Sequence, residues 1–114
     1  MIVHKNEMRP DVWTNIHGGT GSIHVTHLLE ADQMAGKCTL CARCVFQPGD
    51  SIGHHVHATN GEIYYVLEGD LVINEDGTEH TLSAGDVAFT ANGASHSVVN
   101  KTDRPAVMLA VIMP

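Results

Sequence analysis

The chain has 114 residues, of which 43% are hydrophobic and 17% charged; this is the balance of an ordinary globular protein with one core, and it excludes disordered and fibrous classes. Thirteen acidic residues against six basic ones give a formal net charge of −7, which disfavours nucleic acid and anionic membrane surfaces as partners. No apolar run approaches the ~18 residues needed to span a bilayer, so we expect a soluble, cytoplasmic protein.

Residues 1–35 are expected to form a structured extension of a single domain that covers 1–114, with the barrel core in 36–114. The extension contains one predicted strand, 22–29, and a segment at 29–35 with some helical or 3₁₀ character. It also carries apolar residues that a loose tail would lack, namely Trp13, Ile16, Ile23 and Val25. We therefore predict that it takes part in a homodimer.

Turn-forming pairs punctuate the rest of the chain at short intervals, as at Asn60-Gly61 and Gly85-Asp86, and leave room for strands but not for long helices. Many short strands need a sandwich or closure into a barrel, because open edges aggregate. The predicted fold is all-β, with the strands arranged either as a sandwich or as a closed barrel. Its remaining strands are predicted at 38–47, 52–57, 62–67, 70–74, 79–82, 86–90, 96–100 and 106–112.

Three cysteines, Cys38, Cys41 and Cys44, have the spacing C-x2-C-x2-C, which is found in zinc and iron–sulfur sites. On a strand, however, the two-residue period places Cys41 on the face opposite to the other two. With no fourth cysteine in the chain, we interpret the three as reduced thiols packed in a strand; a metal or redox role is the alternative.

The strongest pattern combines His55-Val56-His57 with Glu62, and, further along the chain, His96. Two histidines at i and i+2 of a strand project from the same face, and a tight connection can return the chain so that Glu62 joins them. If the barrel closes, His96 faces this hairpin and completes a set of three imidazoles and one carboxylate.

The two segments, Gly49 to Gly69 and Gly85 to Asn100, resemble the paired motifs G(X)5HXH(X)3-4E(X)6G and G(X)5PXG(X)2H(X)3N of the cupin superfamily. Ala91 stands where the second motif usually carries proline. The resemblance is to a small single-domain cupin, distantly similar to one half of an oxalate decarboxylase-type bicupin. It implies an all-β fold, a single closed antiparallel β-barrel of the jelly-roll type, that binds one divalent metal ion through His55, His57, Glu62 and His96.

Such a ligand set accepts manganese, iron, nickel, cobalt, zinc or copper, and an octahedral ion would keep two adjacent positions open. The ion and Glu62 together favour a small anionic or oxygen-rich ligand. The neighbouring His54 should point to the other face of its strand. The other histidines default to surface or core, with His27 the one to look for near the site: His4, His17, His24, His27 and His80.

Tyr64, on the same strand face as Glu62, is the candidate catalytic residue, with Gln47, Arg43 and Asn100 as further options. The pocket is expected to be lined by Gln47, Tyr64, Val66, Phe89, Val98 and Met108. Two functions follow. The first is a metal-dependent enzyme acting on a small carboxylate or carbonyl compound, of decarboxylase, dioxygenase or isomerase type. The alternative is a non-catalytic cupin that binds a sugar or an organic acid, and a storage role is a third, weaker reading.

Overall fold

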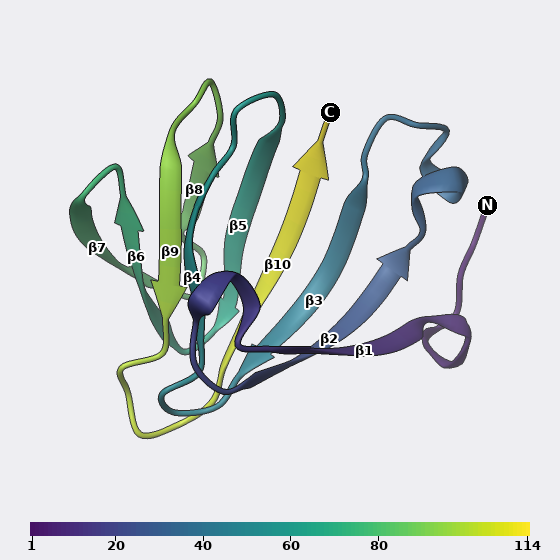
Figure 1. Ribbon diagram of the computed structural model, residues 1–114. Coiled ribbons are helices and arrows are strands. Elements are labelled where there is room, and N and C mark those ends of the chain that lie inside the picture. Colours follow the sequence, from purple (N-terminus) through teal and green to yellow (C-terminus); the bar gives the residue numbers. More distant parts are fainter.

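The computed structural model describes residues 1–114, which form ten strands and three short 3₁₀ helices (Figure 1). The helices are η1 (Lys5–Glu7), η2 (Ile16–Gly18) and η3 (Ala31–Met34). The strands are β1 (Arg9–Thr14), β2 (Ser22–Leu29), β3 (Leu40–Phe46), β4 (Ser51–Val56), β5 (Gly61–Glu68), β6 (Asp70–Glu75), β7 (Thr78–Ser83), β8 (Val87–Thr90), β9 (Ser95–Val99) and β10 (Ala106–Met113). None of the helices has the length and apolar character needed to cross a membrane.

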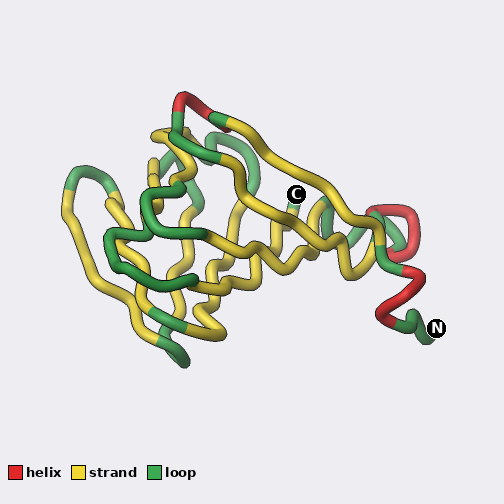
Figure 2. Tube along the Cα trace, turned by 90° about the horizontal axis from the view of Figure 1, so that it is seen from below, coloured by secondary structure: helices red, strands yellow, loops and turns green.

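The strands form two antiparallel sheets that enclose the core between them. One sheet has the order β1-β2-β3-β10-β5-β8 and the other β4-β9-β6-β7. Figure 2 shows the strands arranged around a common interior. Both sheets supply fully buried side chains to this interior, for example Phe46 and Met108 from the first and Leu71 and Val98 from the second. The all-β, jelly-roll prediction is confirmed. The hydrogen-bonded sheets remain separate, however, so the barrel is not closed into one continuous cylinder.

Nine of the ten strands lie within one or two residues of the predicted positions, and η3 occupies the segment predicted to have 3₁₀ character. The tenth, β1, was not expected. It pairs with β2 along its whole length, and the hydrogen bond between Asp11 Oδ2 and His27 Nε2, at 2.9 Å, ties the two strands together. Cys38 lies just before β3 and not within the strand that was predicted to contain it.

Residues 1–35 belong to the larger sheet and do not form a separate layer. Strand β2 lies between β1 and β3, and its Ile23 and Val25 are part of the core. Half-buried Trp13 and Ile16 pack against the same core. These four apolar side chains are therefore packed within the chain itself, whereas Met1, Ile2 and Val12 remain exposed.

A close backbone approach holds η2 against β4. A methyl group added at Gly53 would lie 2.0 Å from the carbonyl oxygen of His17, and one added at Gly19 would lie 2.3 Å from that of Ser51. His17 itself has φ +52°, in the left-handed region that non-glycine residues rarely adopt. Because only glycine fits at both contacts, η2 is fixed over the face of β4 that carries the site.

Candidate metal centre

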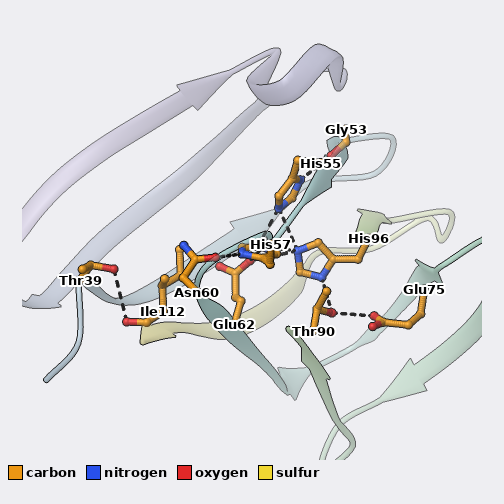
Figure 3. Close-up of polar contacts among 10 residues, drawn as sticks. All are labelled: Thr39, Gly53, His55, His57, Asn60, Glu62, Glu75, Thr90, His96 and Ile112. Atoms are coloured by element: carbon orange, nitrogen blue, oxygen red, sulfur yellow. Dashed lines mark hydrogen bonds and ion pairs between the residues drawn. The ribbon is translucent and has the colours of Figure 1, made fainter. Parts of the chain in front are cut away.

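Three strands and one loop bring His55, His57, Glu62 and His96 together between the sheets (Figure 3). His55 lies near the end of β4, and His57 directly follows that strand. Glu62 lies in β5, from the opposite sheet. His96, in β9, is the register partner of His55. The hairpin and the later strand thus meet as the motif spacing predicted.

The side-chain atoms of these four residues are spaced as metal ligands are. Nε2 of His96 lies 2.8 Å from Nε2 of His55 and 3.0 Å from Nε2 of His57. Oε1 of Glu62 lies 3.0 Å from His96 Nε2, 3.1 Å from His57 Nε2 and 3.7 Å from His55 Nε2. Two ligands at right angles around an ion ~2.1 Å away are themselves ~3.0 Å apart. The residues therefore fit a divalent transition metal ion.

The outward-facing nitrogens fix which tautomer each ring adopts. Nδ1 of His55 donates to the carbonyl oxygen of Gly53 at 2.8 Å, and Nδ1 of His57 donates to Oδ1 of Asn60 at 2.6 Å. Nδ1 of His96 lies 2.9 Å from the hydroxyl of Thr90. In a neutral ring with its proton held on Nδ1, Nε2 presents its lone pair to the centre of the cluster, as metal coordination requires. A ring that carries protons on both nitrogens instead donates from Nε2 towards Glu62.

The charges of the cluster favour an ionised Glu62. Burial would raise the pKa of this carboxyl, but hydrogen bonds from His55 and His96 and the neighbouring imidazole charges outweigh it and lower the pKa to about 2. The pKa of His55 responds in the opposite sense: burial lowers it, and the hydrogen bonds to Glu62 and to the Gly53 carbonyl raise it more. The site is thus prepared for a cation.

A pocket of about 440 Å³ opens onto the cluster. Glu62 is the only carboxylate that lines it, and neither lysine nor arginine does. The rest of the wall is mostly apolar and comes from both the N-terminal segment and the barrel, through Trp13, Ile16, Leu40, Ile52, Tyr64 and Ile112. Apart from Glu62, the pocket therefore offers histidine, asparagine and threonine as polar groups.

Tyr64 lies beside the cluster, as expected. Its ring stacks on that of His96, with centroids 4.5 Å apart and planes 7° apart. Burial, together with the nearby Glu62, raises the pKa of its hydroxyl well above the usual range. Tyr64 is therefore a neutral hydroxyl and an apolar wall at physiological pH.

The other predicted pocket residues lie elsewhere. Val66, Val98 and Met108 are buried in the core and do not line the pocket. Gln47 is exposed, and so is Phe89, at 59%. Of the further options, Arg43 is exposed, and the amide of Asn100 is used in donating to the carbonyl oxygens of Phe46 and Arg104.

His17, which the sequence left as a default histidine, lies at the mouth of this pocket. Its ring stacks on that of His55, with centroids 4.2 Å apart and planes 17° apart. His27 is bonded to Asp11 and lies outside the pocket. The sequence held one indication that His17 lies here. Gly53 is a glycine inside a strand, and such a glycine often marks a place where another backbone segment approaches closely.

The cysteines form no metal cluster. All three are free, with Cys38 and Cys41 half-buried and Cys44 fully buried in the core. Burial raises the pKa of the Cys44 thiol to about 12. This matches the interpretation as reduced, packed thiols.

Comparisons with known proteins agree with this geometry. The family described as a cupin domain matches residues 42–112. An oxalate-binding protein of Thermotoga maritima is 40% identical over 113 residues, which cover 99% of this chain and 93% of that protein. The chain belongs to the cupin family. 

Other relatives show how widely this fold is used. The crystal structure of a predicted oxalate decarboxylase from Thermotoga maritima superposes with a TM-score of 0.93 at 40% identity and covers 99% of this cupin and 98% of that chain. The tetracenomycin polyketide synthase protein TcmJ of Streptomyces glaucescens is 31% identical over 67 residues, which cover 59% of this cupin and 45% of that protein. A shared fold therefore leaves the activity to be argued from the site.

Proposed function

We propose that this cupin holds one divalent transition metal ion through His55, His57, Glu62 and His96 and binds a small carboxylate of the oxalate class at that ion. The observation that carries the proposal is the convergence of three Nε2 atoms and one carboxylate oxygen at ligand spacing, with every Nδ1 anchored outside. The similarity to an oxalate-binding protein over almost the whole chain supports the ligand class.

The residues of the pocket do not explain anion binding by themselves, and the bound metal ion is needed as well. When bound, a divalent ion supplies positive charge and open coordination positions to carboxylate oxygens. The pocket has no lysine or arginine to attract an anion by itself. Its apolar wall, formed in part by Trp13 and Ile112, displaces water from around the ligand and strengthens the attraction. Binding of the anion should therefore depend on the metal.

Binding without turnover is the function that this pocket supports best. The only carboxylate that lines it is Glu62, which is placed as a ligand, and Tyr64 holds its proton tightly. The pocket walls therefore contain no second carboxyl group that could act as a general acid or base.

A metal-dependent enzyme of decarboxylase, dioxygenase or isomerase type is the second candidate. The position of His17 favours it, because this imidazole lies at the pocket mouth, in contact with His55 and within the same pocket. It could accept or donate a proton to a bound carboxylate or carbonyl compound.

The test starts from purified protein whose metal content is measured. Oxalate, diketones and hydroxy acids are then screened for stabilisation against heat and for metal-dependent turnover. Stabilisation that requires the metal, without turnover, supports the binding function; turnover supports the enzyme. The metal-dependent stabilisation and any turnover should disappear in His55→Ala and His96→Ala. They should persist in His80→Ala, which removes an exposed histidine of β7. Stabilisation by oxalate that survives in His96→Ala would contradict the proposal.

We further propose that the protein works in the cytoplasm as a homodimer. The three free thiols suit a reducing compartment.

A further inference from the structure

A hydrogen-bonded chain connects the metal cluster to a second cavity, which is lined by residues of β7 and β8. Its members are His96, Thr90 and Glu75 (Figure 3). The Thr90 hydroxyl lies 2.9 Å from Nδ1 of His96 and 2.6 Å from Oε2 of Glu75. Thr90 and His96 are each 1% exposed, so water does not compete for the hydrogen bond between them.

The chemistry of the three groups fixes the direction of both bonds. A carboxylate oxygen accepts, so the single proton of the Thr90 hydroxyl is donated to Glu75. The hydroxyl oxygen can then only accept from Nδ1 of His96, which must carry its proton there. Nε2 of His96 is left with a free lone pair, 3.0 Å from Oε1 of Glu62. Glu75 thus acts on the tautomer of His96 without touching it.

The strands explain why these residues meet. Glu75 and His96 are register partners on β6 and β9 of the smaller sheet, whereas Thr90 ends β8 of the larger one. The Glu75 side chain also lines a cavity of about 590 Å³ between β7 and β8, together with His80 and Asp86. Because Glu75 borders this open space, replacing its carboxylate need not disturb the packed core.

We propose that Glu75, acting through Thr90, is a positioning residue that fixes His96 in the metal-binding tautomer and strengthens it as a ligand. The inference rests on the metal binding proposed above. A hydrogen-bond acceptor on the outer nitrogen makes a ligating imidazole more basic, and here Thr90 is that acceptor while it donates to Glu75. Removing such a partner from a metal-ligating histidine typically weakens metal binding about 10- to 100-fold. A purely structural reading, in which Thr90 only ties the two sheets together, predicts no such effect.

The experiment measures the affinity of the purified full chain for Zn²⁺ or Mn²⁺ alone, by competition with a coloured chelator, in four variants. Thr90→Val removes the hydroxyl at nearly the same shape, and Thr90→Ser restores it. Glu75→Gln removes the charge, and Glu79→Gln, on exposed β7, is the matched control. We expect about 10- to 100-fold weaker binding in Thr90→Val, a smaller loss in Glu75→Gln, and wild-type affinity in Thr90→Ser and Glu79→Gln.

A second readout follows the Nδ1 proton of His96 by NMR in the zinc-loaded protein. This signal should be protected from exchange in the wild type and in Thr90→Ser, and lost by fast exchange in Thr90→Val. If Thr90→Val and Glu75→Gln both bind the ion with wild-type affinity, the inference about Glu75 is overturned, but the proposed function is not. Should Thr90→Val fail to fold, an unchanged affinity in Glu75→Gln overturns it. A wild-type protein that binds neither ion overturns the proposed function as well, so the two failures are distinguishable.

Discussion

Glu62 is the negative charge on which the buried imidazole cluster depends. Its pKa is about 2 in the folded chain against an ordinary value of 4.5. A depressed folded pKa means that the carboxylate stabilises the fold above about pH 4.5 and that this contribution is lost as the pH falls towards 2. A shift of this size corresponds to about 3 kcal/mol.

The prediction is tested by urea unfolding with chelator present, comparing the wild type with Glu62→Gln. The difference in free energy of unfolding between the two is followed from pH 5 downwards, because the imidazoles themselves change charge between about pH 8 and pH 5. Below that it should shrink by up to about 3 kcal/mol as the wild type loses its advantage. A difference that does not depend on pH would show that Glu62 is not held ionised by the histidines.

Cys44 is the least reactive of the three thiols by the same kind of reasoning. It is fully buried, and its pKa of about 12 keeps it protonated at any physiological pH, whereas thiolates are the reactive form. A disulfide reagent at pH 8 should therefore modify Cys38 and Cys41 in the native protein and reach Cys44 only on unfolding. The reaction that appears only on unfolding should be absent from Cys44→Ala. Rapid reaction of all three thiols in the native protein would contradict the burial of Cys44.

At the scale of elements, the contact between η2 and β4 sets the position of His17. The substitution Gly53→Ala would place a methyl group 2.0 Å from the His17 carbonyl oxygen, so η2 must move away from β4. We expect a loss of about 1–3 kcal/mol in stability and weaker binding of oxalate, because His17 leaves the pocket mouth. Metal affinity should change less than oxalate binding, since only His55 of the four ligands contacts Gly53 and His17.

The matched control for this change is Gly36→Asn. Gly36 has φ +71° and open space around it, and asparagine tolerates this conformation. It should leave stability and oxalate binding close to those of the wild type. Equal oxalate affinity in Gly53→Ala would show that η2 does not shape the ligand pocket. 

The elements that were predicted from the sequence are those whose alternation shows which face is buried. In β5, buried Glu62, Tyr64 and Val66 alternate with more exposed neighbours, and turn residues mark both ends. Strand β1 gave no such signal: it is an edge strand, it contains Pro10, and none of its residues is fully buried. Its pairing with β2 is decided by tertiary contacts, such as the one between Asp11 and His27, that the local sequence does not encode.

The same distinction holds for the site. Spacing places His55, His57 and Glu62 on one hairpin, and the second motif adds His96, so the sequence was enough to predict that they converge. His17 and Thr90 reach the site through contacts between elements, the first through Gly53 and the second across the two sheets. No spacing rule links such residues to the motif, and only the folded chain reveals them.

For the whole molecule, an ion bound only by the native state should stabilise the fold by mass action. At an ion concentration about 100 times the Kd, this amounts to about 2.7 kcal/mol, or ~10 °C in Tm for a domain of this size. Chelator should lower the Tm of the metal-loaded protein accordingly and leave that of His96→Ala unchanged. Identical melting curves with and without chelator would contradict tight metal binding.

We expect the homodimer to use an apolar surface outside the N-terminal segment. In the N-terminal segment, Trp13 and Ile16 pack against the chain's own core, whereas Ile2 and Val12 are 81% and 49% exposed. The outer face of β5 and β8 has a larger group of exposed apolar side chains: Val87 and Phe89 are 62% and 59% exposed, and Leu67 and Tyr65 are 45% and 38% exposed. Tyr65 and Val87 are register partners, so these side chains form one continuous patch.

A continuous apolar patch of this kind marks an interaction site, and in a two-fold homodimer the same patch is buried on both copies. We therefore expect light scattering to give twice the chain mass of 12.2 kDa. Phe89→Asp should yield the monomer, because a second copy would bury the new charge without a partner. Val12→Asp, at an exposed position of β1 outside the patch, should remain a dimer. A wild-type protein that is monomeric at micromolar concentration would contradict the predicted dimer.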